Sequence, residues 1–103
     1  MIARHWKGIA KKDRADEYIA HLRNETFKGL DKIDGFLSSS ILTRNVEAGT
    51  EFLIITEWEN INSIKNFAGE DYEVAVVPQV VKNIMISYDH LASHYEITYT
   101  DKG

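Results

Sequence analysis

The sequence has no cysteine among its 103 residues, and it also lacks any long apolar run. The absence of cysteine excludes disulfides, thiolate metal sites and a cysteine nucleophile, and it is compatible with a reducing compartment. No transmembrane segment or secretory leader is expected, because Arg4 and Lys7 introduce charge into the first residues. We therefore expect a soluble, cytoplasmic protein with no membrane partner.

Basic patches and phosphate-binding motifs are also missing. Lysine and arginine number 12 against 16 aspartate and glutamate residues, and the only adjacent lysines that stand out are Lys11-Lys12. The resulting net charge of -4 argues against nucleic acid or an anionic membrane as a partner. Glycine-rich phosphate cradles are absent, and Ser38-Ser39-Ser40 lacks the setting of a hydrolase nucleophile. Length and a hydrophobic content of 44% predict a single domain over residues 1–103.

The apolar periodicity changes along the first half of the chain. Residues 2–8 alternate as a strand that places Arg4 and Trp6 on one face. From Asp13, which can serve as an N-cap, apolar residues recur at helical spacing until Asp34-Gly35 ends the helix. Two further strands, 36–45 and 51–59, then form a hairpin whose loop carries Gly49, where a positive φ is expected.

The second half predicts two short helices and a closing strand. Asn60 caps a helix that Gly69 ends, and Pro78 begins a second helix whose apolar side extends to Met85. Between them, residues 70–77 are expected to be irregular. The last strand is predicted to run from Ser93 to Thr100.

The predicted order βαββαβ matches the α+β, ferredoxin-like split βαβ arrangement with an antiparallel sheet. Both crossover helices must then lie on one face of that sheet. On the third strand, Phe52 and Ile54 lie on one face while Leu53 and Ile55 lie on the other, and both pairs are apolar. Since helices can cover only one face, we expect the other face to pack against a second copy and form a homodimer.

Several local patterns support a family resemblance when they are taken together. Trp6 lies on the first strand, Asp34-Gly35-Phe36-Leu37 enters the second, Glu57-Trp58 precedes a helix ending in Asn66-Phe67-Ala68-Gly69-Glu70-Asp71, and His94-Tyr95-Glu96-Ile97 closes the sheet. In this order and spacing, the chain resembles the antibiotic biosynthesis monooxygenase family of dimeric α/β barrels over essentially its whole length.

The resemblance implies a ligand pocket between the sheet and its helices, for a small hydrophobic or aromatic molecule. It also implies, as in some members, oxygenation of phenols or quinols with no flavin, haem or metal as cofactor. Such a site needs an aromatic wall and a few polar groups that stabilise a phenolate and assist proton transfer. The candidate catalytic residues are His94, Arg4 and Tyr72, and the candidate substrate-binding residues are Trp6, Trp58, Tyr95 and Phe67.

Other interpretations remain open at this point. Arg4 can instead pair with a helix carboxylate, and Trp6 and Trp58 can belong to the core. His90, His94 and Glu96 allow a two-histidine, one-carboxylate metal site to be drawn, but no HExxH motif supports it, and we expect no metal. Haem degradation is disfavoured, because Phe67 stands where the related haem-degrading proteins have a tryptophan. The alternative functions are a non-catalytic dimer that binds a hydrophobic metabolite and a purely structural protein.

Overall fold

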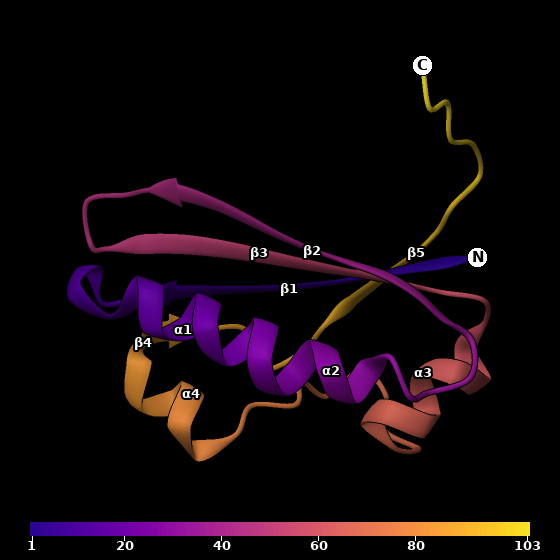
Figure 1. Cartoon of the computed structure of the whole chain (residues 1–103), viewed down its shortest axis with the longest axis horizontal. Coiled ribbons are helices and arrows are strands. Elements are labelled where there is room, and N and C mark those ends of the chain that lie inside the picture. The colour runs from indigo at the N-terminus through magenta and orange to yellow at the C-terminus, as the bar shows by residue number, and fades with distance from the viewer.

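The computed structural model describes residues 1–103 and shows one antiparallel sheet with all helices on one of its faces (Figure 1). The strands are β1 (Ile2–Ala10), β2 (Phe36–Asn45), β3 (Thr50–Trp58), β4 (Met85–Tyr88) and β5 (Ser93–Glu96). The helices are α1 (Ala15–His21), α2 (Phe27–Leu30), α3 (Ile61–Ala68) and α4 (Gln79–Ile84). The predicted α+β, ferredoxin-like fold is confirmed, and in the single chain the sheet is open rather than closed into a barrel.

The strand order is β2-β3-β1-β4, and β5 pairs with the other half of β1. β4 lies opposite residues 8–10 of β1, whereas β5 lies opposite residues 2–5. The fourth position of the sheet is therefore filled by two short strands with a break between them. The predicted closing strand ended too late, since β5 stops at Glu96, and Met85 begins β4 instead of extending the helix. Apolar residues suit either element, and pairing with β1 decides between them.

The long helical segment is not uniform. A 3₁₀ turn at Lys12–Arg14 precedes α1, and a π-helical turn at Leu22–Thr26 joins α1 to α2. Asp13 lies inside the 3₁₀ turn and makes no capping hydrogen bond, so the prediction that it is the N-cap is wrong. The helix ends at Leu30, and Gly35 adopts a φ of 89° in the turn that leads to β2. There, a side chain would be strained and would also collide with Ser63.

Two other glycines show different local constraints. Gly69 ends α3 with a φ of 88°, and the Asn60 Oδ1 accepts a 2.9 Å hydrogen bond from the Ser63 N–H, as the capping pattern predicts. Gly49, however, does not have a positive φ. It is needed because a Cβ at this position would collide with the backbone carbonyl oxygen of Ala10. The loop thus needs a glycine at position 49, as predicted, but the reason is the close approach of Ala10 and not a positive φ.

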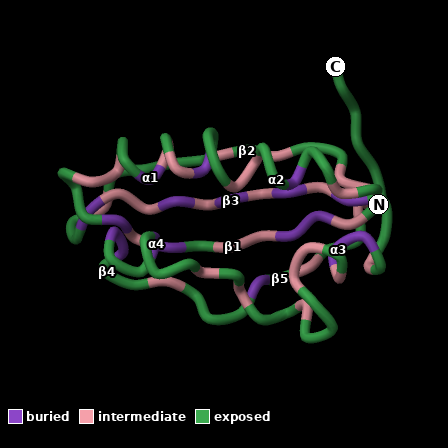
Figure 2. Tube along the Cα trace, turned by 60° about the horizontal axis from the view of Figure 1, so that its bottom comes forward, coloured by how far each residue is buried: buried purple, intermediate pink, exposed green.

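The core lies between the sheet and the helices, and burial alternates along β3 (Figure 2). Phe52, Ile54 and Trp58 are buried on the face that the helices cover. Leu53 and Ile55 point to the other face, where they are only half-buried. The sheet thus has one covered face and one open face. None of the helices combines the length and the apolar character needed to cross a membrane.

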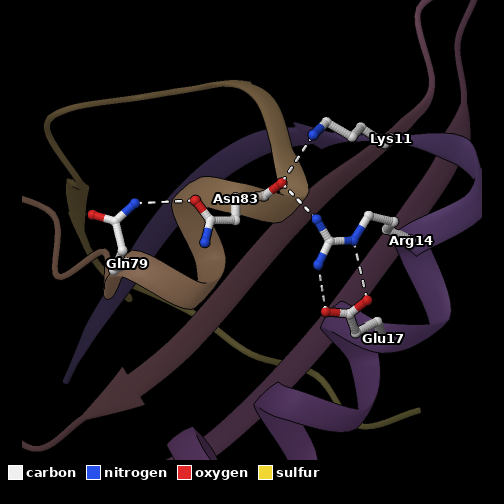
Figure 3. A network of polar contacts seen from close by, with 5 residues as sticks. All are labelled: Lys11, Arg14, Glu17, Gln79 and Asn83. Carbon is white, nitrogen blue, oxygen red and sulfur yellow. Dashed lines mark hydrogen bonds and ion pairs between the residues drawn. The ribbon is translucent and has the colours of Figure 1, made fainter.

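Helix α4 is held at its C-terminal end by the start of the α1 segment (Figure 3). The carbonyl oxygen of Asn83 accepts hydrogen bonds from Lys11 Nζ at 3.0 Å and from Arg14 Nη1 at 2.8 Å. Arg14 also pairs with Glu17 at 2.7 Å. Cations are favourable at a helix C-terminus because the last carbonyl groups carry partial negative charge. These contacts fix α4 over the covered face of the sheet.

Candidate functional site

A cavity of about 80 Å³ lies between the covered face of the sheet and the helices. Ten of its 14 lining residues are hydrophobic. Strands β1 and β3 form the floor of the cavity. Arg4 lies opposite Thr56 there, and Trp6 lies opposite Ile54. Helices α1, α2, α3 and α4 and residues of the loop before α4 complete the walls. We call residues 70–78, which connect α3 to α4, the strap.

Arg4 is the one charged residue in the cavity wall, and only 5% of it is exposed. It has no carboxylate partner. Its Nη1 donates a hydrogen bond to the carbonyl oxygen of Tyr72, its Nη2 lies 3.4 Å from the carbonyl oxygen of Val74, and its guanidinium lies 5.7 Å from the Phe67 ring centroid. Burial lowers the Arg4 pKa to about 10, so the guanidinium remains charged at neutral pH. The cavity therefore contains a cation whose partners are all neutral.

His94 lies directly behind Arg4, with its Nε2 2.9 Å from Arg4 Nη1. A guanidinium can only donate, so Nε2 must accept and the imidazole must be neutral with its proton on Nδ1. Burial and the neighbouring Arg4 charge lower the His94 pKa, and Glu73 partly opposes them. His94 is not part of the cavity wall. It can affect a bound molecule through Arg4, which it orients.

We predict that replacing His94 with glutamine reduces the fall in unfolding free energy that the wild type shows as the pH drops from about 8 to about 5. The folded-state pKa of His94 is lowered, so the unfolded chain binds this proton more readily, and unfolding free energy should fall as the pH drops below about 6.5. Urea unfolding between pH 5 and pH 8 measures the effect. His90→Gln gives the control variant, because His90 is an exposed histidine that packs against Tyr88 and makes no contact with Arg4. An unchanged profile in His94→Gln would contradict the assigned neutral state.

The structure brings some of the predicted site residues together and separates others. Arg4, Trp6 and Phe67 line the cavity. Tyr72 belongs to the strap, where its carbonyl holds Arg4 and its ring packs edge-on against His94 with centroids 5.1 Å apart. These groups come from β1, α3, the strap and β5, and the sheet pairing unites them.

Two predicted substrate-binding residues lie outside the cavity. Trp58 is 0% exposed and stacks behind Phe67 with ring centroids 5.9 Å apart, while its indole N–H donates to Thr56 Oγ1 at 2.9 Å. It supports the wall instead of forming its surface. Tyr95 is 56% exposed and lies on the open face of the sheet against His5, because it alternates with His94 along β5. The prediction that Tyr95 lies in the pocket is therefore wrong, because neighbouring residues of a strand point to opposite faces.

Sequence reasoning missed several polar residues of the cavity. Tyr18, Thr26 and Thr56 all line it, and each carries a hydroxyl into a largely apolar wall. The available signal was a polar group at a core position: Tyr18 and Thr26 fall on the apolar stripe of the helix. The π-helical turn next to the cavity, in which the Phe27 N–H bonds to the Leu22 carbonyl, had no recognisable sequence signal.

The metal site drawn from the sequence does not assemble. No three histidine, cysteine, aspartate or glutamate side chains are grouped in a way that could hold a metal ion. His90 is exposed and packs against Tyr88, whereas His94 faces Arg4. The break between β4 and β5 separates the two histidines.

Comparisons with known proteins agree with this architecture. The family described as "Antibiotic biosynthesis monooxygenase" matches residues 1–77. A crystal structure of a candidate antibiotic biosynthesis monooxygenase from Bacillus cereus superposes with a TM-score of 0.69, covering 99% of this chain and 95% of that chain at 17% identity. At that identity the likeness establishes the fold alone. No curated protein matches the sequence.

Proposed function

Since the chain belongs to the antibiotic biosynthesis monooxygenase family, we propose that it oxidises a small phenol or quinol with dioxygen and without a bound cofactor. The cavity between sheet and helices is the proposed substrate site. The family match supports a monooxygenase-like domain, and the chemistry of the cavity supports the choice of an acidic aromatic substrate.

The observation that carries the proposal is the Arg4 charge. Burial lowers the pKa of Arg4 from 12.5 to about 10, which shows that the surroundings disfavour the charged form without removing it. Buried charges are normally paired, because desolvation costs several kcal/mol per ion. A phenolate in the cavity would supply the missing anion next to the guanidinium. The surrounding apolar and aromatic wall would contact its ring.

The proposed chemistry uses Arg4 to stabilise the substrate as its anion. Arg4 lowers the free energy of the phenolate, and an electron-rich phenolate can itself transfer an electron to dioxygen. The resulting pair of radicals can then combine in the closed site, where bulk water is excluded, to give a peroxide anion on a ring carbon. This anion takes up a proton, equivalent to the one that the phenol released on binding. The hydroperoxide then loses water together with the hydrogen of that carbon, so one oxygen atom stays in the new carbonyl group and the other leaves as water. His94 and the Tyr72 carbonyl hold the guanidinium in position. In this scheme Arg4 touches the substrate, and His94 acts through Arg4.

The size of the cavity indicates that the strap must shift when a substrate enters. A cavity of about 150 Å³ accommodates benzene, and this one is about 80 Å³. Ala75, Val76 and Pro78 of the strap form part of its wall. Their neighbours Tyr72 and Val74 accept hydrogen bonds from Arg4. An entering phenolate would displace the longer contact, which Nη2 makes with the Val74 carbonyl, and so loosen the strap while the Tyr72 carbonyl continues to hold the guanidinium.

Oxygen consumption tests this proposal directly. Purified protein is added to a panel of anthrones, quinols and naphthols in an oxygen electrode, and the products are analysed by mass spectrometry for an added oxygen atom. Substrate-dependent uptake above the uncatalysed rate is expected for at least one compound. A panel that gives no uptake above that rate would count against catalysis.

The alternative is a dimer that binds a hydrophobic metabolite without converting it. The position of His94 favours this alternative, because its Nε2 faces Arg4 and no free base lines the cavity. Thermal stabilisation by panel compounds that are never consumed would select it over the monooxygenase.

We further propose that the open face of the sheet is the homodimer interface. Proteins of this family are generally dimeric. On this chain, Leu42, Leu53 and Ile55 bring apolar side chains to the open face, and no helix covers them. Apolar patches of this kind mark association surfaces.

Replacing Leu53 with aspartate tests this interface. The substitution puts a charge at the centre of the apolar set, so the wild type should sediment as a dimer at micromolar concentration and the variant as a monomer. Thr43→Asp on β2 is the control, because Thr43 pairs with Phe52 and so lies on the opposite face of the sheet. A monomeric wild type would refute the interface.

A further inference from the structure

Tyr18 is a polar residue of the cavity whose hydroxyl makes no side-chain hydrogen bond within the chain. Only 2% of it is exposed, it lines the cavity, and its hydroxyl makes no hydrogen bond with any protein group. Burial raises its pKa, so the hydroxyl is neutral and can donate one hydrogen bond. The one fully enclosed side-chain atom without a hydrogen-bond partner is His21 Nε2, so the Tyr18 hydroxyl keeps some accessible surface and can be reached by a molecule in the cavity.

The sheet register places Tyr18 at the end of the cavity away from Arg4. Along the covered face, Arg4 pairs with Thr56, Trp6 pairs with Ile54, and the next pair is Gly8 with Phe52. The Tyr18 ring packs edge-on against Phe52 with centroids 4.8 Å apart, and it lies 6.4 Å from the Trp6 ring. The rows of Arg4 and Gly8 are roughly 13 Å apart along β1. The Arg4 guanidinium and the Tyr18 ring thus lie toward opposite ends of the cavity, with Trp6 between them.

We propose that the Tyr18 hydroxyl selects the substrate by donating a hydrogen bond to an acceptor oxygen at the end of the molecule opposite the oxygen held by Arg4. The inference rests on the proposed function and makes it more specific. The preferred ligand is a flat hydroxylated aromatic of about two rings that carries a carbonyl group at its far end. Rings without this carbonyl leave the buried hydroxyl unpaired and bind less well.

The experiment compares two probes that differ in the acceptor alone, 2-naphthol and 6-acetyl-2-naphthol. Their dissociation constants are measured by quenching of tryptophan fluorescence for the wild type, Tyr18→Phe and Tyr88→Phe. Tyr88 is the matched control, because its ring also contacts Trp6, at 6.2 Å, but it is not part of the cavity wall. The ratio of variant to wild-type constants for each probe cancels the difference in acidity between the probes.

Tyr18→Phe is expected to weaken 6-acetyl-2-naphthol three- to tenfold, the usual range for one neutral hydrogen bond, and to change 2-naphthol by less than twofold. Tyr88→Phe should leave both constants unchanged. Equal changes for the two probes in Tyr18→Phe would overturn the role of Tyr18 and leave the phenol site intact. Failure of both probes to bind the wild type would count against the proposed function itself, and the inference would fall with it.

Discussion

Replacing Arg4 with methionine is expected to weaken the binding of phenolates strongly while the stability of the fold changes little. The loss of a charge-assisted hydrogen bond should weaken affinity by about 10- to 100-fold. Stability should change little, because the removal of a buried charge that no carboxylate compensates offsets the loss of the hydrogen bonds to the Tyr72 and Val74 carbonyls. Ligand titration and urea unfolding of the same sample measure the two effects.

The conservative variant Arg4→Lys separates charge from geometry. Lysine keeps the cation but loses the planar fork that contacts the Tyr72 and Val74 carbonyls together with His94. We expect intermediate affinity and a more mobile strap, visible as faster hydrogen exchange in residues 70–78. If Arg4→Met unfolded more readily and still bound phenolates, Arg4 would be a structural residue and the cavity would need another anion site.

Replacing Trp58 with alanine is expected to give the largest loss of stability among the aromatic residues. Trp58 is fully buried between Phe36 and Phe67, at ring-centroid distances of 5.3 and 5.9 Å, so truncation leaves a large void. Comparable substitutions cost about 3–5 kcal/mol, a large share of the 5–15 kcal/mol typical of a domain. Urea unfolding followed by circular dichroism measures the change.

Two further variants determine whether Trp58 supports the wall or binds the substrate. Trp58→Phe keeps a ring against Phe67 and loses the hydrogen bond to Thr56, so it should retain most ligand affinity. Tyr99→Ala, at a position that is 79% exposed, should change stability by no more than about 0.5 kcal/mol. Trp58→Phe with wild-type stability and lost ligand binding would instead place Trp58 in contact with the ligand.

The division of the fourth strand position into β4 and β5 could not be predicted from the sequence. The hairpin of β2 and β3 and the caps of α3 were predictable, because alternation, capping and glycine geometry are local properties of the chain. Ile84 and Met85 are apolar in both a helix and a strand, so their local pattern could not locate the end of α4. Pairing of β4 with β1 made that decision.

In the candidate site, too, local patterns were predictable and the pairing of distant strands was not. Alternation along β1 correctly placed Arg4 and Trp6 on one face, and alternation along β5 requires His94 and Tyr95 to lie on opposite faces. The prediction nevertheless grouped both of the latter in the pocket, because it did not establish which face of β5 meets the helices. The register of β5 against β1, which joins His94 to Arg4, answers that question.

By itself, the sequence determined the hairpin of β2 and β3, the alternation of faces along each strand and both ends of α3, since these depend on the backbone geometry of neighbouring residues. Only the tertiary structure decided that Arg4 is buried without an anion, that the strap carbonyls and His94 surround it, and that Tyr18 lies at the far end of the same cavity. Those properties depend on desolvation and on contacts between residues far apart in the chain, which arise when the elements pack together.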